Sequence, residues 1–528
     1  MSLLRRTPDI SPQTENEPLL VPNGQPSTPL TGGGVLAKNA LWNLGGLAAP
    51  MAVAILCIPV IVNRLGAEKF GVLNLAWMVI GYFTFFDLGL GRALTKLVAE
   101  KLGHERQDDL LGLVWTASLL MLALGILGGI VLGLLTPYLV NHIFKVSDGI
   151  RQETTRTFYL LAAAVPLVIS TTGLRGILEA HQRFDLSCRL RVAMGAFTFL
   201  GPMLVLPFSR DLFWITLALL AGRLVAWWFH LAFCFRVIPA LKVEILMELR
   251  AVRPLLEFGG WMTVSNLIAP VVTYLDRFLV GSYISMAAVA YYSTPWEVVT
   301  KFLVIPGAVV GVLFPAFSAA AVRDPARAAG IYRRGVKYVF LALFPLTWLT
   351  VSFAREGMHL WLGAEFAENG YRVMQLLSIG ILINGLACVP FAFIQGVGRP
   401  DVTAKIHMCE LLIYVPCAFW LVRRYGATGA ALSWTLRASA DALLLFGGAM
   451  RFAAPRSVRR NWLPVAGIPA FVAALFVMML PWAFVPKVVV TVAAIAAFGI
   501  ATWFTGMDAN EKEYVRGKLG WFVRPSTG

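Results

Sequence analysis

The sequence LEAHQRFDLSCRL at Leu178–Leu190 resembles the sequence IQGVGRPDVTAKI at Ile394–Ile406, which lies 216 residues later. Each stretch follows a long apolar run. Aligned without gaps, the two stretches share three charged positions, which pair Arg183 with Arg399, Asp185 with Asp401 and Arg189 with Lys405. A repeated polar turn is harder to obtain by chance than similarity between apolar helices, so these residues predict an internal duplication.

Other residues repeat at a slowly drifting offset. Pro50 precedes Pro270 by 220 residues, and Arg223 precedes Arg437 by 214. Two copies of six helices each, with small insertions, would produce this drift. Because six is an even number, both copies enter the membrane from the same side, and an axis along the membrane normal should relate them.

The composition places most of the chain in a membrane. The 528 residues are 58% hydrophobic and only 14% charged, with a mean hydropathy of +0.72. Apolar runs of about 20 residues, each long enough to cross a bilayer, recur along the chain. We therefore expect an all-α polytopic membrane protein. Its fourteen predicted transmembrane helices are 38–63, 70–91, 110–138, 157–175, 190–208, 212–235, 255–280, 287–316, 338–354, 373–396, 406–422, 427–450, 462–482 and 485–504.

The repeat and the spans together predict five regions of the chain. Residues 1–37, rich in Pro, Gly and polar residues, read as a disordered cytoplasmic tail. Six-helix bundles follow at 38–238 and 251–450, and helices 13 and 14 occupy 451–504. Residues 505–528 are expected to form a cytoplasmic tail that lies on the membrane surface.

The basic residues predict the orientation. With the N-terminus inside, the inner segments hold 30 Lys and Arg and the outer loops hold 12. The positive-inside rule then makes both termini cytoplasmic. The net charge of +16 reflects this topology, so we expect no nucleic-acid partner.

Neither cysteines nor histidines form a recognisable metal motif. The six cysteines include no CxxC pair, and the six histidines show no HExxH spacing. We expect no metal site and no cofactor.

Three stretches resemble a known family. They are FGVLNLAWMVIGYFTFFDLGLGRALTKLVAE (Phe70–Glu100), YLDRFLVGSYISMAAVAYYSTPWEVV (Tyr274–Val299) and QGVGRPDVTAKIH (Gln395–His407). They are similar to bacterial O-antigen and exopolysaccharide repeat-unit flippases, the polysaccharide transporter branch of the multidrug/oligosaccharidyl-lipid/polysaccharide exporter superfamily.

The resemblance implies an inner-membrane, alternating-access flippase with two six-helix bundles around a central cavity. Its cargo would be polyprenyl-diphosphate-linked oligosaccharide, moved from the cytoplasmic to the periplasmic leaflet for surface polysaccharide synthesis. The implied partners are this lipid-linked cargo, membrane lipid, and a polysaccharide polymerase and glycosyltransferases of the same pathway.

Charges inside the predicted spans are the candidate functional residues. A charge at the bilayer centre costs roughly 2.5–3.5 kcal/mol on insertion scales, so each should face a cavity or a partner. The cationic candidates for contact with a diphosphate are Lys301, Arg223, Arg437 and Arg277. We expect Lys301 and at least one of Arg223 and Arg437 to line a shared cleft between the bundles.

Local pairs are the structural alternative for two of these cations. Arg437 precedes Asp441 by four residues, which suits a helical ion pair. Arg277 either pairs with the adjacent Asp276 or extends its guanidinium to the outer interface. Lys301 and Glu297 are also four apart, so we expect them to interact.

The acidic candidates for binding a coupling ion are Asp276, Glu297, Asp87, Asp441 and Glu410. For Asp87 the alternative is an interfacial pair with Arg92. The first span lacks the acidic residue of related proton-coupled drug exporters and the arginines of related lipid II flippases, which leaves the coupling ion open.

An ion-coupled multidrug exporter of the same superfamily is the nearest alternative function, and a cavity without cations would favour it. A polymerase, ligase or glycosyltransferase would need a large outer loop with paired catalytic residues, and neither long outer loop, 139–156 or 355–372, offers one. We therefore expect a protein that is not an enzyme. A membrane scaffold would not explain the intramembrane charges.

The orientation can be tested with reporter fusions. Fusions at Gly24 and Gly520 should be active only with a cytoplasmic reporter, because the basic residues hold both ends inside. Activity of a periplasmic reporter at either site would contradict the predicted topology.

Overall fold

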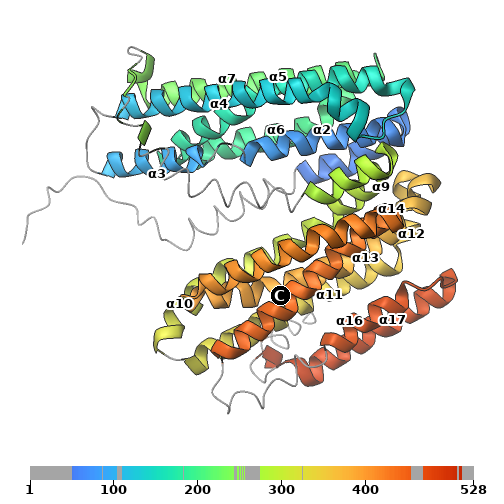
Figure 1. The fold of residues 1–528 in the computed structure, drawn as a ribbon. Helices are drawn as coiled ribbons and strands as arrows, with labels where there is room; N and C mark the ends of the chain where they lie inside the picture. Colours follow the sequence, from blue (N-terminus) through green and yellow to red (C-terminus); the bar gives the residue numbers. More distant parts are fainter. Residues whose placement is uncertain are drawn as a thin grey trace, which may run out of the picture.

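The computed structural model describes residues 50–85, 87, 89–103, 110–181, 183–242, 246–248, 250, 252–253, 255, 274–323, 325–453, 468–507 and 511–513. These residues form α-helices joined by short turns, with single turns of 3-10 or π-helix and, within the described ranges, no strand. The helices gather in two lobes, one from each half of the chain (Figure 1). The predicted all-α class is confirmed.

The N-terminal lobe contains the first described helices. They are an initial helix Pro50–Leu65, α2 (Ala67–Phe85), α3 (Leu90–Gly103), α4 (Leu110–Tyr138), α5 (Asp148–Ala180), α6 (Phe184–Val205) and α7 (Leu212–Val237). Between α2 and α3 the carboxylate of Asp87 accepts hydrogen bonds from the backbone N–H groups of Gly89 and Gly91, both at 3.0 Å. Asp87 therefore caps α3, because it satisfies amides that have no partner within the helix.

The C-terminal lobe holds the remaining described helices. They are the segment 274–283, α9 (Met286–Val299), the 3-10 turn η3 (Thr300–Leu303), α10 (Val304–Arg323), α11 (Pro325–Ser352), α12 (Ala354–Leu362), α13 (Ala364–Gly396), α14 (Pro400–Ala453), α16 (Ile468–Met478) and α17 (Phe484–Ala501). The last pair packs on α11 through aromatic rings, with centroids 5.2 Å apart for Phe344 and Phe471 and 4.7 Å apart for Phe344 and Phe498. Helices α16 and α17 are thus attached to this lobe.

The structure supports many of the expected spans without fixing their number. Nine described helices are long and apolar enough to cross a membrane. One of them, Pro400–Arg451, joins two predicted spans across a kink at Gly426, where φ is 61°. Residues 1–49, 256–273 and 454–467 lie outside the described residues, so the count of fourteen and the bounds of the five regions stay predictions. The tail 505–528 is described only at 505–507 and 511–513.

The duplicated turns have the same hydrogen bonds. Arg183 donates from Nε and Nη2 to the two carboxylate oxygens of Asp185 at 3.0 and 3.2 Å, and Arg399 donates to Asp401 in the same way at 2.9 and 3.2 Å. The backbone N–H groups of these arginines donate to the carbonyls of Leu178 and Ile394. Each carboxylate raises the pKa of its arginine partner by hydrogen bonding. The two matching stretches of sequence therefore adopt the same local structure.

The two lobes touch where α2 meets α9. A Cβ atom added to Gly71 would lie 1.7 Å from the carbonyl oxygen of Met286, so the two backbones are in direct contact. Two hydrogen bonds also cross between the lobes. The indole of Trp361 donates to the carbonyl of Ile55 at 2.8 Å, and the N–H of Lys145 donates to the carbonyl of Gly281 at 3.0 Å. All three contacts lie near ends that the predicted topology places on the outer side.

We expect Gly71→Ala to lower the thermal stability of the purified protein, because the new methyl group must displace Met286 or separate the lobes. Overpacking of this kind costs roughly 1–3 kcal/mol. The matched control is Gly307→Ala in α10, where an added Cβ meets nothing within 4 Å. The melting temperature in detergent should fall for the first variant and stay level or rise for the second. Equal melting temperatures would contradict the tight contact.

Candidate functional site

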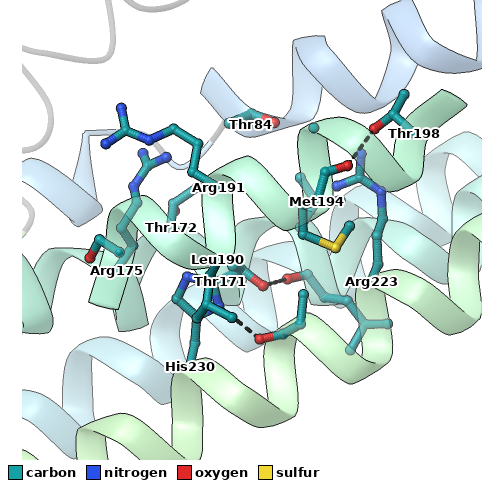
Figure 2. A pocket seen from close by; sticks show the side chains of 15 residues that line it. Thr84, Thr171, Thr172, Arg175, Leu190, Arg191, Met194, Thr198, Arg223 and His230 are labelled. Atoms are coloured by element: carbon teal, nitrogen blue, oxygen red, sulfur yellow. Dashed lines mark hydrogen bonds between the residues drawn. The ribbon is translucent and has the colours of Figure 1, made fainter. Parts of the chain in front are cut away.

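A basic cavity lies inside the N-terminal lobe. It has a volume of about 210 Å³ and is lined by residues of α5, α6 and α7 and by Thr84 of α2 (Figure 2). Three guanidinium groups and one imidazole line it, from Arg175, Arg191, Arg223 and His230. We call this space the N-lobe pocket. Of the candidates chosen from the sequence it contains Arg223, while Lys301 and Arg437 lie elsewhere.

Positive charge predominates in the N-lobe pocket. Among its cations only Arg175 has a carboxylate partner in the described ranges, with 3.6 Å between its Nε and Glu179 Oε1. For Arg191 and Arg223 no ion pair to a described residue is present. The Nδ1 atom of His230 hydrogen-bonds the Ala226 carbonyl at 2.7 Å, which leaves Nε2 available.

One hydroxyl in the same wall has no partner. Ser187 is 1% exposed, and its Oγ has no hydrogen-bond partner among the described residues. A buried polar group normally finds such a partner, so this hydroxyl suits a bound polar molecule. Unpaired guanidinium groups beside a free hydroxyl form a site for an anion with several acceptor oxygens, such as phosphate.

A second set of charges runs through the C-terminal lobe, and we call it the C-lobe array. It begins at Glu297 of α9, whose carboxylate lies 3.3 Å from Lys301 Nζ and 3.4 Å from Arg277 Nη2. The expected interaction of Lys301 with Glu297 is confirmed. Lys301 is 45% exposed and Arg277 only 5%. The guanidinium of Arg277 also lies over the rings of Tyr274 and Trp296, each 5.5 Å away.

Asp276 is held by phenols and not by its neighbour Arg277. It is 1% exposed, and it accepts hydrogen bonds from the hydroxyls of Tyr292, at 2.7 Å, and Tyr414. The suggested Asp276–Arg277 pair is therefore wrong, because adjacent side chains on this helix point to different partners.

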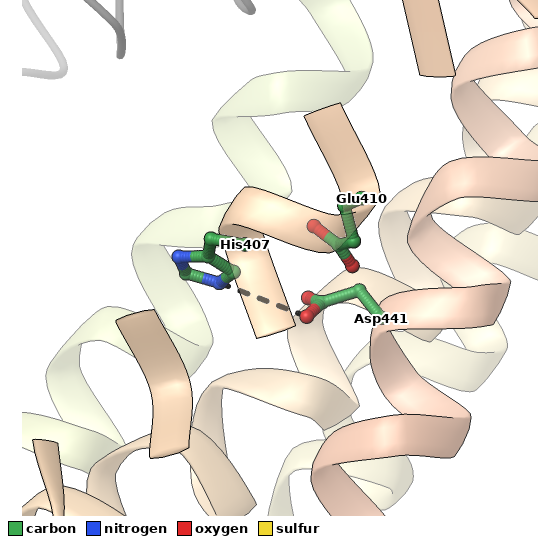
Figure 3. Close-up of side chains that lie close together, drawn as sticks. All are labelled: His407, Glu410 and Asp441. Carbon is green, nitrogen blue, oxygen red and sulfur yellow. Dashed lines mark ion pairs between the residues drawn. The ribbon is translucent and has the colours of Figure 1, made fainter. Parts of the chain in front are cut away.

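The array continues into α14. Arg437 Nη1 lies 3.6 Å from Glu410 Oε2, and Asp441 Oδ1 lies 3.7 Å from His407 Nε2 (Figure 3). The local Arg437–Asp441 pair is thus wrong. The guanidinium of Arg437 lies over the rings of Tyr414 and Trp434, and Trp434 meets Trp296 edge-on at 4.9 Å. Aromatic rings therefore link the two ends of the array.

The structure separates residues that the sequence analysis grouped together. Arg223 lies in the N-lobe pocket, whereas Lys301, Arg277 and Arg437 lie in the C-lobe array. A shared cleft between the lobes stays a prediction. Asp87 caps α3 through Gly89 and Gly91, so the alternative pair with Arg92 does not describe its hydrogen bonds.

Sequence reasoning missed four basic residues of these sites. Arg175 and Arg191 counted only toward the orientation, since the predicted spans ended at residue 175 and began again at 190. Helix α5 continues to Ala180 and α6 begins at Phe184, so both arginines are helical and reach the pocket. His230 and His407 were set aside with the scattered histidines. The repeat offset of 216 residues, which pairs Arg191 with His407, was a usable signal.

Arg277 and Lys301 both pair with Glu297, but they differ in burial. Replacing them should therefore lower the free energy of unfolding by different amounts. Arg277→Ala removes a buried guanidinium and two ring contacts, which should cost about 2 kcal/mol. Lys301→Ala removes an exposed ion pair, with a cost of about 0–1 kcal/mol. Thermal unfolding in detergent should therefore show a clear loss only for Arg277→Ala. A larger loss for Lys301→Ala would contradict the burial of Arg277.

Comparison with known proteins identifies similar chains. The profile of a family described as "Polysaccharide biosynthesis protein" matches residues 36–321. A Shigella flexneri protein named "Putative O-antigen transporter" is 30% identical over 412 residues, which cover 78% of this chain and 96% of that protein. The "Probable low-salt glycan biosynthesis flippase Agl15" of Haloferax volcanii is 21% identical over 390 residues, 72% of this chain and 76% of that protein.

Solved structures share the fold. A structure of the lipid II flippase MurJ in an inward closed conformation aligns with a TM-score of 0.67 at 13% identity, and covers 88% of this chain and 99% of its own. An inward-facing multidrug resistance MATE family transporter of the MOP superfamily aligns with a TM-score of 0.66 at 15% identity, over 79% of this chain and 99% of its own. At these identities the likeness concerns the fold alone.

Proposed function

Because the chain belongs to the polysaccharide biosynthesis protein family, we propose that it is a flippase for polyprenyl-diphosphate-linked oligosaccharide. It moves repeat units from the cytoplasmic to the periplasmic leaflet of the bacterial inner membrane, and both of its termini are cytoplasmic. A polysaccharide polymerase and glycosyltransferases act before or after it on the same cargo.

The N-lobe pocket is the observation that carries this proposal. Guanidinium groups without carboxylate partners are costly among apolar helices, and a diphosphate that leaves the lipid headgroup layer needs charge-assisted hydrogen bonds. In such a complex the guanidinium groups gain anionic acceptors, and the diphosphate gains hydrogen-bond donors. In this proposal Arg191 and Arg223 bind the diphosphate, Ser187 donates to one of its oxygens, and the sugars occupy space outside the pocket.

The relatives support transport of a lipid-linked glycan over catalysis. Two related proteins are named a transporter or a flippase, and one of them matches along 96% of its length. The MATE neighbour keeps a multidrug exporter as the second candidate. An anionic cargo suits the three arginines of the pocket better than the cationic or neutral compounds that an aromatic cavity would favour.

Deletion of the gene tests the function directly. Lipid-linked oligosaccharide should accumulate on the cytoplasmic leaflet of the deletion strain, and the wild-type gene should reverse this. Normal export in the deletion strain, with intact surface polysaccharide, would refute the proposed cargo.

Complementation by arginine variants tests the pocket. Arg191→Ala should reduce export about tenfold or more, because one charge-assisted hydrogen bond contributes roughly 1.5–3 kcal/mol. Arg223→Lys should retain part of the activity lost in Arg223→Ala, since the charge survives while the fork geometry does not. Arg189→Ala is the matched control, because Arg189 lies two positions away and is exposed like Arg191, but it does not line the pocket. Equal export by the Arg189 and Arg191 variants at equal protein levels would exclude the pocket as the diphosphate site.

A further inference from the structure

Two carboxylates and an imidazole meet at the end of the C-lobe array. One oxygen each from Glu410 and Asp441 and a ring nitrogen of His407 all lie within 4.8 Å of one another. The side chains of Glu410 and Asp441 are 6% and 7% exposed, whereas His407 is 49% exposed. His407 stacks on Phe391 with ring planes 13° apart, which orients the imidazole. An accessible imidazole therefore adjoins two buried acids.

The two acids are not satisfied by the described protein. Glu410 Oε1 and Asp441 Oδ1 are buried, and neither has a hydrogen-bond partner among the described residues. Arg437 reaches only the other oxygen of Glu410, at 3.6 Å. Two neighbouring carboxylates in a medium of low dielectric constant repel each other strongly when both are ionised. The pair therefore needs a positive charge between its free oxygens.

A count of the charged groups in the C-lobe array shows how much positive charge it lacks. Its cations are Lys301, Arg277 and Arg437, and its carboxylates are Asp276, Glu297, Glu410 and Asp441. With His407 neutral, the array lacks one positive charge. A single proton restores neutrality, whereas a divalent metal ion would leave an excess of one. Cys388 on α13 and Tyr414 on α14 are the other titratable groups near Asp441 and Arg437.

The repeat places the acid pair at the counterpart of the N-lobe pocket. At the offset of 216 found in the duplicated turns, His407 corresponds to Arg191 and Glu410 to Met194. At the offset of 214, Arg437 corresponds to Arg223. Equivalent places thus hold an anion site in one lobe and two buried acids in the other.

We propose that Glu410 and Asp441 share one proton, which enters and leaves through His407, and that this proton drives transport. The imidazolium Nε2 of His407 gives its proton to Asp441 Oδ1, the carboxyl group then bonds Glu410 Oε1, and solvent reprotonates the imidazole. The link to transport rests on the proposed flippase function, while the proton site itself does not.

Infrared spectroscopy of the purified protein tests the site without any cargo. The wild type at neutral pH should show the carbonyl stretch of a protonated carboxylic acid. Glu410→Gln and Asp441→Asn should each lose that band, because the remaining carboxylate no longer has a neighbour that opposes its ionisation. Glu368→Gln is the matched control and should keep the band, since Glu368 is 59% exposed and paired with Arg355. A band that survives in both single variants would overturn the proposal.

His407 and added ions give two further readouts. His407→Ala should keep the band at equilibrium and slow its response to a pH jump, and an unchanged response would remove His407 from the path. Sodium chloride or zinc chloride alone should leave the wild-type band in place. Loss of the band with either salt, together with a melting temperature that rises only when both acids are present, would show that a metal ion occupies the site instead of a proton.

Transport measurements test whether the proton site drives export, independently of whether the site exists. In cells whose surface polysaccharide depends on this protein, Glu410→Gln should abolish the dependence of export on the pH gradient. Export that keeps its full gradient dependence in this variant would overturn the coupling role even if the infrared band is present. A deletion strain with normal export would refute the flippase function and leave the infrared test of the proton site unaffected.

Discussion

Hydrocarbon does not solvate charge, and this constraint bears on the ionic groups of the C-lobe array and the N-lobe pocket. In the C-lobe array, cations and carboxylates from 274–283, α9, η3 and α14 contact one another, and aromatic rings cover the guanidinium faces of Arg277 and Arg437. In the N-lobe pocket the cations outnumber their partners. The two lobes therefore differ in charge: the N-lobe pocket has arginines without described carboxylate partners, and the C-lobe array has one more carboxylate than it has lysines and arginines.

Much of the fold was predictable because it depends on patterns along the chain. Apolar runs of the right length predict helices whatever their neighbours are. The duplicated turn was predictable because Arg183–Asp185 and Arg399–Asp401 are local pairs, two residues apart, that form from the sequence in their own neighbourhood. The repeat also predicts one bundle from each half of the chain, and the described helices gather in two lobes.

The pairing of the charges was not predictable in the same way. A spacing of four residues predicts an ion pair between Arg437 and Asp441. Gly426 instead breaks α14 and brings its two halves together, so Glu410 of one half reaches Arg437 of the other.

The ends of the helices were also difficult to predict from the sequence. Hydropathy placed Arg175 and Arg191 at the very ends of the predicted spans 157–175 and 190–208, so they counted as boundary charges, whereas the helices reach further, to Ala180 and from Phe184. A helix boundary depends on backbone hydrogen bonds that polar residues also make.

The contact between Gly71 and Met286 has a mechanical consequence. Side chains pair across the same junction, because the rings of Phe70 and Phe366 lie 6.4 Å apart and those of Phe144 and Phe278 lie 5.6 Å apart, so a relative rotation of the lobes must keep or repack these pairs. A rotation of a few degrees about this junction would move the far ends of helices such as α3 and α10 by many times the displacement at the glycine. Any relative motion of the lobes would therefore be smallest where Gly71 lets the two backbones touch.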